Sequence, residues 1–301
     1  MYFFFTTIYA ASRNSEMEVY MECTVQNVKI YYKTYGEGIP VLMIHGWSPD
    51  HRLMKGCMEP VFKTMDKQWK RIYFDLPGMG KTKGEPWITS SDQMLDLILE
   101  FIDTVIPNQP FVLAGESYGG YLARGIINKR ASAVDGLLLV CPLAEQEIVK
   151  ENGGKFQVLE KDSHLLSSLT EEDRNYFEGE GINSLQNKRV WARFKEEVIP
   201  GLKIADYKFL KNLSGKFSFN VDSLENPYMK PTLMLTGRQD SIVGYRGLWQ
   251  IIEMYPRASF ILLDSAGHNL QIEQDVLFTE TVREWLNRVA VEKLKTQNLW
   301  G

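Results

Sequence analysis

Three residue types that together activate a nucleophile are spread along this chain: a serine between glycines, an aspartate and a histidine. Residues 115–120 read GESYGG and put Ser117 in a glycine-rich turn directly after the apolar run FVLA. A serine hydroxyl stays protonated at neutral pH, so it needs a general base beside it, and the base needs an acid that fixes its tautomer. The turn alone would also suit a flexible strand end, so the histidine and the aspartate decide between the two interpretations.

His268 is the best candidate for the base. It follows the apolar run FILL in the stretch DSAGHN, where Gly267 lets the loop bend the imidazole inward. The other histidines are His45 and His51, which share one loop ahead of the serine, and His164, which lies in a region without strand-like runs. The alternative for His268 is a turn histidine with local hydrogen bonds.

Asp240 is the best candidate for the acid. It lies in TGRQDS, directly after the apolar run TLML. Asp264 begins the histidine loop itself, and Asp135 lies at the wrong end of its predicted strand. The alternative role for Asp240 is an Asx turn within GRQDS. We expect Ser117, Asp240 and His268 to form a catalytic triad.

The elements that must position these residues are short apolar runs typical of strands buried on both faces. Apolar residues at helical spacing separate the runs, as at Leu95, Ile98, Leu99 and Ile102. Residues 28–33 alternate instead and predict a half-exposed strand. This alternation predicts an α/β fold with a mostly parallel, doubly wound sheet. The runs are 40–44, 71–74, 111–114, 136–140, 232–235 and 260–263.

Polar loops follow five of these runs. Ligands bind at the carboxyl ends of the strands in such sheets, so the serine, aspartate and histidine loops are expected to meet there. The loop DLPGMGKT at 75–82 resembles a phosphate-binding loop only superficially, because its glycines do not have the spacing G-x-x-x-x-G-K-[ST]. We therefore expect no nucleotide site.

From about residue 26 to 290 the chain resembles the α/β-hydrolase superfamily. Gly115, Ser117 and Gly119 match its G-x-S-x-G nucleophile elbow, and Asp240 and His268 follow in its order. The resemblance implies an α/β-hydrolase fold flanked by helices, with a helical cap insertion. The stretch at 75–82 is similar to the family's D-x-P-G-x-G turn.

The pair HG at 45–46 is similar to the family's oxyanion loop, although it departs from the HGGG and HGGPG forms. The resemblance implies that the backbone N–H groups of Trp47 and Tyr118 form the oxyanion hole. Such donors stabilise the charge that develops on the substrate oxygen in the transition state. Trp47 is also expected to shape one wall of the pocket.

The segment from Pro142 to about Pro227 lacks strand-like runs, and Val190, Phe194 and Val198 share one helical face. We predict that 142–227 is a helical cap, that 16–141 and 228–301 form the core, and that 1–15 is a poorly defined N-terminal extension rather than a signal peptide. His45, Trp191 and Phe194 are assigned to the substrate pocket. The cap aromatics that could face it are Trp191, Phe194, Tyr207, Phe209, Phe217 and Phe219.

A serine at the elbow disfavours epoxide hydrolases and haloalkane dehalogenases, which resemble the chain but use aspartate there. The sequence predicts a serine hydrolase that cleaves a small carboxylic ester through an acyl-enzyme, without a cofactor or a metal. A peptidase or amidase remains open, with Glu171, Glu172 and Asp173 as candidate partners of a substrate amine. Hydrolysis of C–C bonds also remains open, as does a ligand-binding receptor or inactive relative with the same fold.

The composition excludes other classes. A formal net charge of −4 and the lack of a basic block argue against nucleic-acid binding. The three widely spaced cysteines predict reduced thiols in a cytoplasmic protein, not disulfides or a zinc site. Apolar stretches stay well short of a membrane span. The expected partner is a small-molecule substrate, and the oligomeric state and the role of Glu116 stay open.

Overall fold

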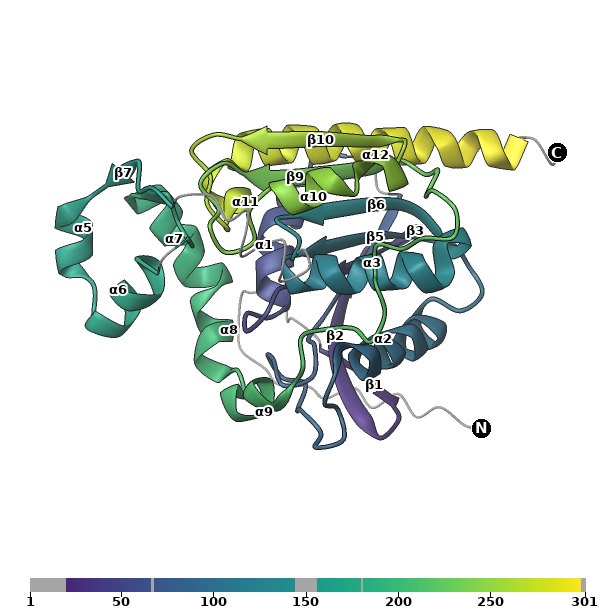
Figure 1. The fold of residues 1–301 in the computed structure, drawn as a ribbon, viewed down its shortest axis with the longest axis horizontal. Helices are drawn as coiled ribbons and strands as arrows, with labels where there is room; N and C mark the ends of the chain where they lie inside the picture. Colours follow the sequence, from purple (N-terminus) through teal and green to yellow (C-terminus); the bar gives the residue numbers. More distant parts are fainter. Residues whose placement is uncertain (1–19, 66–67, 144–155, 180, 299–301) are drawn as a thin grey trace.

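The computed structural model describes residues 20–65, 68–143, 156–179 and 181–298, so the predicted extension at 1–15 lies outside the described residues. An eight-stranded sheet forms the centre, in the order β1-β2-β4-β3-β5-β6-β9-β10 (Figure 1). The pairs β1–β2 and β2–β4 are antiparallel and the others are parallel. The strands are β1 Met21–Val25, β2 Val28–Tyr35, β3 Ile39–Ile44, β4 Trp69–Phe74, β5 Phe111–Glu116, β6 Val134–Val140, β9 Thr232–Gly237 and β10 Ala258–Leu263.

Helices cover both faces of the sheet. Helices α2 (Ser91–Val105) and α3 (Tyr118–Arg130) pack on one apolar cluster, and α1 (His51–Phe62) and α12 (Asp275–Asn298) pack on the other. Successive strand residues point to opposite faces, so each central strand serves both clusters and must be apolar throughout. This arrangement confirms the predicted doubly wound α/β fold.

Strands are present at all six predicted runs, but the predicted burial is wrong for β10, an edge strand in which Leu262 is 37% exposed. Strand β1 and helix α1 were not predicted. Strand β1 buries only Cys23 and Val25, so its pattern is too short to stand out. Helix α1 contains Gly56 and Pro60, which disfavour helix, yet Asp50 caps its first turn and its apolar residues fall on one face. The strand predicted at 28–33 is present, but Lys33 does not lie on an exposed face as its alternation predicted, since it is 2% exposed.

The insertion after β6 is mostly helical and lies beyond the carboxyl ends of the parallel strands (Figure 1). Its helices enclose a small apolar cluster around Phe177, Val190 and Phe194, which Leu53 and Ile272 of the core join. The boundaries 142–227 for a cap remain a proposal. The elements are β7 Glu160–Lys161, α5 Ser163–Ser168, α6 Glu171–Phe177, β8 Leu185–Gln186, α7 Lys188–Glu197, α8 Ile199–Ile204 and α9 Tyr207–Asn212.

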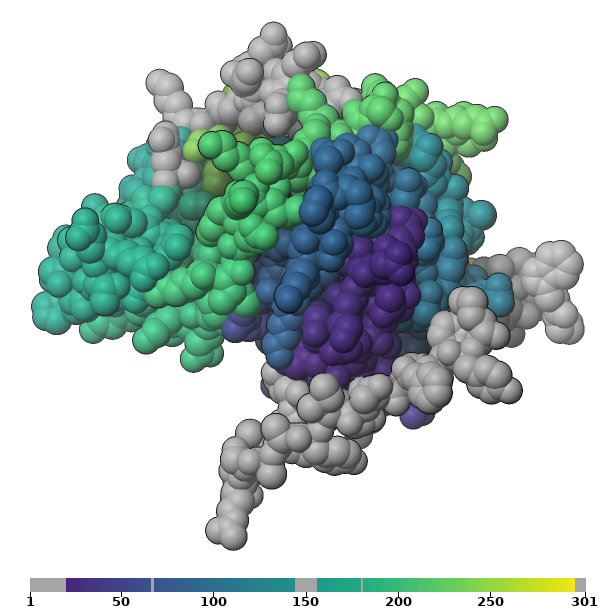
Figure 2. Space-filling view, turned by 90° about the horizontal axis from the view of Figure 1, so that it is seen from below, coloured from purple at the N-terminus to yellow at the C-terminus, as the bar shows by residue number. Residues whose placement is uncertain are grey.

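The chain returns from the insertion to the core along one side of the molecule. Figure 2 shows the green residues of this return beside the blue residues that precede and begin α2. Ser214 forms a bridge with Ser90, and the N–H of Ser218 donates to the carboxylate of Asp92. The return therefore extends the insertion's contact with the core well beyond its two junctions. Two short elements, α10 (Arg246–Gln250) and α11 (Leu270–Glu273), complete the core.

Candidate active site

The turn between β5 and α3 holds Ser117 in a conformation that an ordinary residue avoids. Its backbone has φ 52° and ψ −117°, a strained combination for a residue with a side chain. The neighbouring glycines make this turn possible. A Cβ on Gly115 would lie 2.3 Å from the carbonyl oxygen of Gly119, and a Cβ on Gly119 would lie 2.3 Å from that of Ile44. The sharp turn presents the Ser117 hydroxyl above the strand end.

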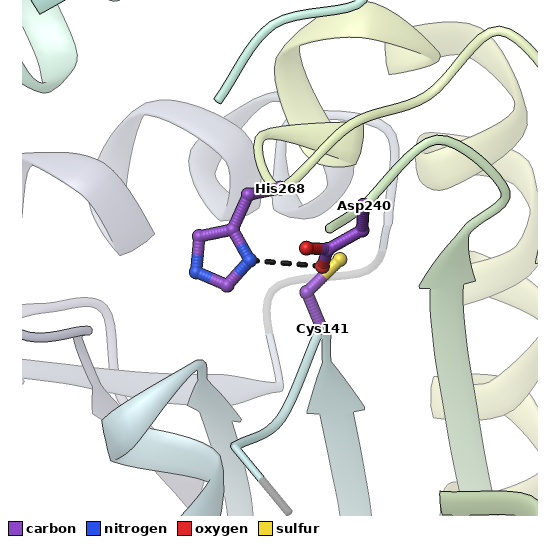
Figure 3. Close-up of side chains that lie close together, drawn as sticks. All are labelled: Cys141, Asp240 and His268. Atoms are coloured by element: carbon purple, nitrogen blue, oxygen red, sulfur yellow. Dashed lines mark hydrogen bonds and ion pairs between the residues drawn. The ribbon is translucent and has the colours of Figure 1, made fainter. Parts of the chain in front are cut away.

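The side chains of Ser117, His268 and Asp240 form one continuous chain of hydrogen bonds. Nε2 of His268 lies 2.9 Å from Oγ of Ser117. On the other side of the ring, Nδ1–H of His268 donates to Oδ2 of Asp240 over 2.9 Å (Figure 3). The three residues follow the ends of β5, β9 and β10, and β5 is far from the other two strands in the sequence. A neutral His268 in this tautomer presents an unprotonated Nε2 to the Ser117 hydroxyl.

Asp240 is fixed in place by its own loop. It is 1% exposed, and its Oδ1 accepts hydrogen bonds from the backbone N–H groups of Ile242 and Val243. The Asx-type contact and the contact to histidine therefore occur together, one on each oxygen. Cys141, at the end of β6, lies beside the Asp240 carboxylate (Figure 3). Burial and the adjacent carboxylates raise the pKa of its thiol well above the usual range.

The competing acids lie elsewhere. Asp264 is exposed and accepts a hydrogen bond from Gln239, and Asp135 pairs with Lys293 at the other end of the sheet. These placements leave Asp240 as the carboxylate that reaches Nδ1 of His268.

Two further carboxylates surround the imidazole. Burial acts to lower the pKa of His268, but the charge and hydrogen bond of Asp240, together with Glu116 and Glu273, raise this pKa to about 9. Oε1 of Glu116 lies 3.6 Å from Nε2 of His268, which is too far for a hydrogen bond but close enough for a strong electrostatic effect. Burial raises the pKa of Glu116 itself to about 7.

The loop after β3 forms the other side of the site. The backbone N–H groups of Trp47 and Tyr118, which were assigned to an oxyanion hole, have no hydrogen-bond partner within the described part of the chain. The Trp47 and Tyr118 rings pack edge to face, 4.9 Å apart. One of these N–H groups follows Gly46 and the other follows Ser117 in the chain, and their assignment to an oxyanion hole stays a prediction.

His45 supports this loop and does not face a ligand. It is fully buried, its Nε2 accepts a hydrogen bond from the N–H of Leu76, and its Nδ1 lies 2.8 Å from the carbonyl oxygen of Gly46. Burial lowers the pKa of His45. The assignment of His45 to the substrate pocket is therefore corrected, because Nε2 binds the segment that follows β4, Nδ1 binds the loop itself, and His45 does not line the cavity.

A cavity of about 250 Å³ opens above Ser117 and His268 between the core and the cap. Of the cap aromatics proposed for the pocket, Phe194 lines it. Trp191 does not, because its ring packs against Phe177 within the cap. The lining residues are Gly46, Trp47, Pro49, Leu53, Glu116, Ser117, Asn175, Tyr176, Gly179, Ile182, Phe194, Val198, Leu202, His268 and Asn269.

The other predicted cap residues also lie outside this cavity. Phe217 packs against Tyr121 and Phe219, Phe209 fills the space over Gly78, and Tyr207 is half exposed. The acidic residues considered for a substrate amine do not reach it either, since Glu172 and Asp173 pair with Lys203 and Glu171 is exposed. A larger hollow of about 660 Å³ lies near Trp69 and Arg71, and neither the serine nor a histidine lines it.

Glu273, which sequence reasoning missed, joins the histidine loop to the cap. Its buried carboxylate accepts hydrogen bonds from the N–H of Gly267, the N–H of Leu185 and the hydroxyl of Ser184. The N–H of His268 donates to the carbonyl oxygen of Gly181. Nothing in the stretch LQIE marks Glu273 in advance, because only the folded cap brings those donors to it.

Among the residues that the structure describes, two groups of side chains are close enough to share a metal ion, Cys141 with Asp240 and His268, and Asp50 with His51 and Asp75. In the first, both oxygens of Asp240 and both ring nitrogens of His268 already take part in hydrogen bonds. In the second, Asp50 pairs with Arg52, and Asp75 accepts hydrogen bonds from His51 and Lys81. Neither group presents a free set of ligands.

Comparison with known proteins identifies the family. A family model described as the alpha/beta hydrolase fold matches residues 39–275. The chain therefore belongs to the α/β-hydrolase superfamily, which confirms the resemblance seen in the sequence.

Individual relatives span nearly the same range. The chain is 25% identical to the monoacylglycerol lipase ABHD6 of Homo sapiens, over 78% of this chain and 71% of that protein. It is 24% identical to a pimeloyl-[acyl-carrier protein] methyl ester esterase of Legionella pneumophila, over 86% and 100%. A crystal structure of an alpha/beta superfamily hydrolase from Oenococcus oeni has a TM-score of 0.79, at 29% identity over 89% of this chain and 99% of that one. Among the described residues, no helix is both long and apolar enough to cross a membrane.

Proposed function

We propose that this chain is a carboxylic ester hydrolase that works through Ser117, His268 and Asp240. The observation that carries the proposal is the chain of hydrogen bonds from Ser117 through His268 to Asp240, at the floor of a largely apolar cavity. The names of the human lipase and the Legionella esterase, both of which describe ester cleavage, support the choice of an ester.

In the proposed reaction, Oγ of Ser117 attacks the ester carbonyl while Nε2 of His268 takes its proton. The imidazolium is stabilised by the Asp240 carboxylate at Nδ1. The N–H groups of Trp47 and Tyr118 donate to the oxyanion of the tetrahedral intermediate, and each such donor contributes about 3 kcal/mol of transition-state stabilisation. His268 then protonates the leaving alcohol. A water molecule, activated by the same histidine, hydrolyses the acyl-enzyme.

A fluorophosphonate probe tests the nucleophile. We expect covalent labelling of Ser117 in the native chain and no labelling in Ser117→Ala, with ester turnover reduced by several orders of magnitude. Ser167, an exposed serine whose hydroxyl donates to the carbonyl oxygen of His164, provides the matched control, because Ser167→Ala retains Ser117 and should be labelled as the native chain is. An unlabelled Ser117, with Ser117→Ala indistinguishable from the parent, would leave the chain as a binding protein.

A substrate panel tests the bond that is cleaved. p-Nitrophenyl esters of increasing acyl length are compared with aminoacyl arylamides under the same conditions. We expect turnover of short and medium esters, because the cavity volume of about 250 Å³ limits the size of the substrate. Turnover confined to the arylamides would contradict ester hydrolysis and show that the chain is an amidase.

A further inference from the structure

Glu116 is a buried polar residue of the site that the triad does not use. It is the last residue of β5, is 2% exposed and lines the cavity beside Ser117 and His268. Within the described part of the chain its Oε2 has no hydrogen-bond partner. Its Oε1 lies 3.6 Å from Nε2 of His268, beyond hydrogen-bond distance. Buried carboxyl oxygens are normally satisfied, so a cavity-lining carboxyl that keeps an unsatisfied oxygen points to a group supplied by a ligand.

The position of this carboxyl defines which part of a substrate it can touch. A Cβ on Gly46 would lie 2.2 Å from Oε2 of Glu116, so the glycine of the oxyanion loop leaves the space that the carboxyl occupies. On its other side the carboxyl neighbours Nε2 of His268, the atom that protonates the leaving alcohol in the proposed reaction. Glu116 is therefore adjacent to the leaving oxygen.

We propose that Glu116 binds a hydroxyl group on the leaving alcohol of the substrate, on the carbon next to the ester-bearing carbon. The substrates would then be monoesters of vicinal diols. This inference rests on the proposed ester hydrolysis and adds the class of alcohol to it.

The surroundings of Glu116 favour a neutral hydroxyl over a charged group. No lysine or arginine is among the described residues that line the cavity, so no side-chain cation neutralises the carboxyl there. The charged groups that face it are His268 and Asp240. The backbone N–H of Gly46 also acts on the carboxyl and lowers its pKa. A hydroxyl can donate to an ionised carboxylate and accept from a protonated one, whereas an ammonium group suits only the ionised form.

The remainder of the cavity suits the hydrocarbon part of such an ester. Leu53, Ile182, Phe194, Val198 and Leu202 contribute apolar surface away from the nucleophile. Polar recognition is thus concentrated beside the reacting bond. This division matches an apolar acyl chain joined to a small hydroxylated alcohol.

The test compares two esters of nearly identical shape, hydroxyethyl butanoate and propyl butanoate, which differ by a hydroxyl in place of a methyl group. Values of kcat/KM are divided by the alkaline hydrolysis rate of each ester to remove intrinsic reactivity. We expect the native chain to favour the hydroxyethyl ester by about tenfold, as for one hydrogen bond to a carboxylate. Glu116→Met should remove this preference, and Glu116→Gln, which keeps a polar end of the same shape, should retain most of it.

Each outcome of the ester comparison either supports or overturns the proposed hydroxyl subsite. Equal normalised rates for the two esters in the native chain would overturn the hydroxyl subsite while leaving ester hydrolysis in place, and this holds even where Glu116→Met fails to fold. A preference that persists unchanged in a folded Glu116→Met variant would do the same. Turnover of neither ester, with Ser117 also unlabelled by a fluorophosphonate, would instead remove the proposed function and with it this inference.

Discussion

His268 lies between two carboxylates, and this placement governs the pH at which its imidazole can act as a base. Asp240 binds Nδ1 directly, while Glu116 lies 3.6 Å from Nε2. Both negative charges favour the imidazolium, and together with Glu273 they raise the pKa of His268 to about 9 against the effect of burial. A protonated imidazole cannot accept the Ser117 proton, so activity requires the deprotonated ring.

The pH dependence of kcat/KM follows from this charge arrangement. We expect the activity of the native chain on propyl butanoate to rise with pH, with a midpoint on the alkaline side of neutrality. Glu116→Gln removes one of the charges that favour the imidazolium, so the midpoint should move to lower pH by roughly one pH unit. Steady-state rates between neutral and alkaline pH measure the shift.

The control for this profile is Glu284→Gln, which removes a carboxylate that is 60% exposed on α12. Its midpoint should match that of the native chain, because an exposed charge far from the site is screened. A midpoint in Glu116→Gln that stays in place, or moves to higher pH, contradicts the electrostatic role of Glu116.

At the residue scale the sequence predicted the identity of Ser117, Asp240 and His268, because each follows a recognisable strand. It did not indicate what His45 does, since a histidine in an HG pair looks the same whether it faces a ligand or the core. Glu116 likewise stayed open. Its side chain's burial and its approach to Gly46 depend on how two loops from different strands pack, which local sequence does not record.

At the scale of elements, the histidine loop and the cap form one hydrogen-bonded unit. The N–H groups of His268 and Asn269 donate to the carbonyl oxygens of Gly181 and Ile182. Glu273 adds bonds to both sides of the joint. Burial raises the pKa of Glu273 to about 7, although its backbone N–H donors act to lower it. The position of the base is thereby tied to the position of the cap.

Glu273→Gln tests this joint. The amide retains one acceptor oxygen, but its NH₂ group must face a donor, either the N–H of Gly267 or the pair from Leu185 and Ser184. We expect kcat to fall by about tenfold or more while KM changes little, since misplacing the base affects the chemical step. Hydrogen exchange at 181–185 should increase at the same time.

The matched control is Glu253→Gln, which alters an exposed glutamate outside the cap and should leave both measurements unchanged. Slower turnover without faster exchange at 181–185 would show that Glu273 acts on His268 alone and not through the cap.

The elements themselves were predictable to different degrees. Six strands could be located because continuous apolar runs of this length, bounded by turn residues, are typical of strands covered on both faces. Strand β10 has such a run but lies at the sheet edge, so the pattern overestimated its burial. Strand β1 and helix α1 could not, because the first is short and the second contains Gly56 and Pro60. The cap's helical content was visible in its periodicity, but the faces of its helices were not. Trp191 and Phe194 are close neighbours on α7, yet only Phe194 reaches the cavity.

At the scale of the whole molecule, one buried arginine connects both ends of the insertion to the core. Arg124 lies in α3, the helix that begins directly after Ser117, and is 1% exposed. Its Nη1 donates to the carbonyl oxygen of Leu143, where the insertion begins. Its Nε and Nη2 donate to the carboxylate of Asp222 on the returning segment. A single side chain of the helix after Ser117 thus bonds to both ends of the insertion.

Arg124→Met should therefore destabilise the whole fold rather than the cap alone. It leaves the Asp222 carboxylate, which is 13% exposed, without its partner, and it leaves the Leu143 carbonyl without this donor. Removing one member of a buried ion pair costs about 3–5 kcal/mol in the free energy of unfolding, which equilibrium denaturation in urea measures. The double variant Arg124→Met/Asp222→Leu should recover much of this loss, because no buried charge then remains unpaired.

The control is Arg130→Met, which alters an arginine on the same helix that pairs with the exposed Asp103. It should change the free energy of unfolding by less than about 1 kcal/mol. If Arg124→Met proves as mild as Arg130→Met, the two ends of the insertion are held to the core by other contacts.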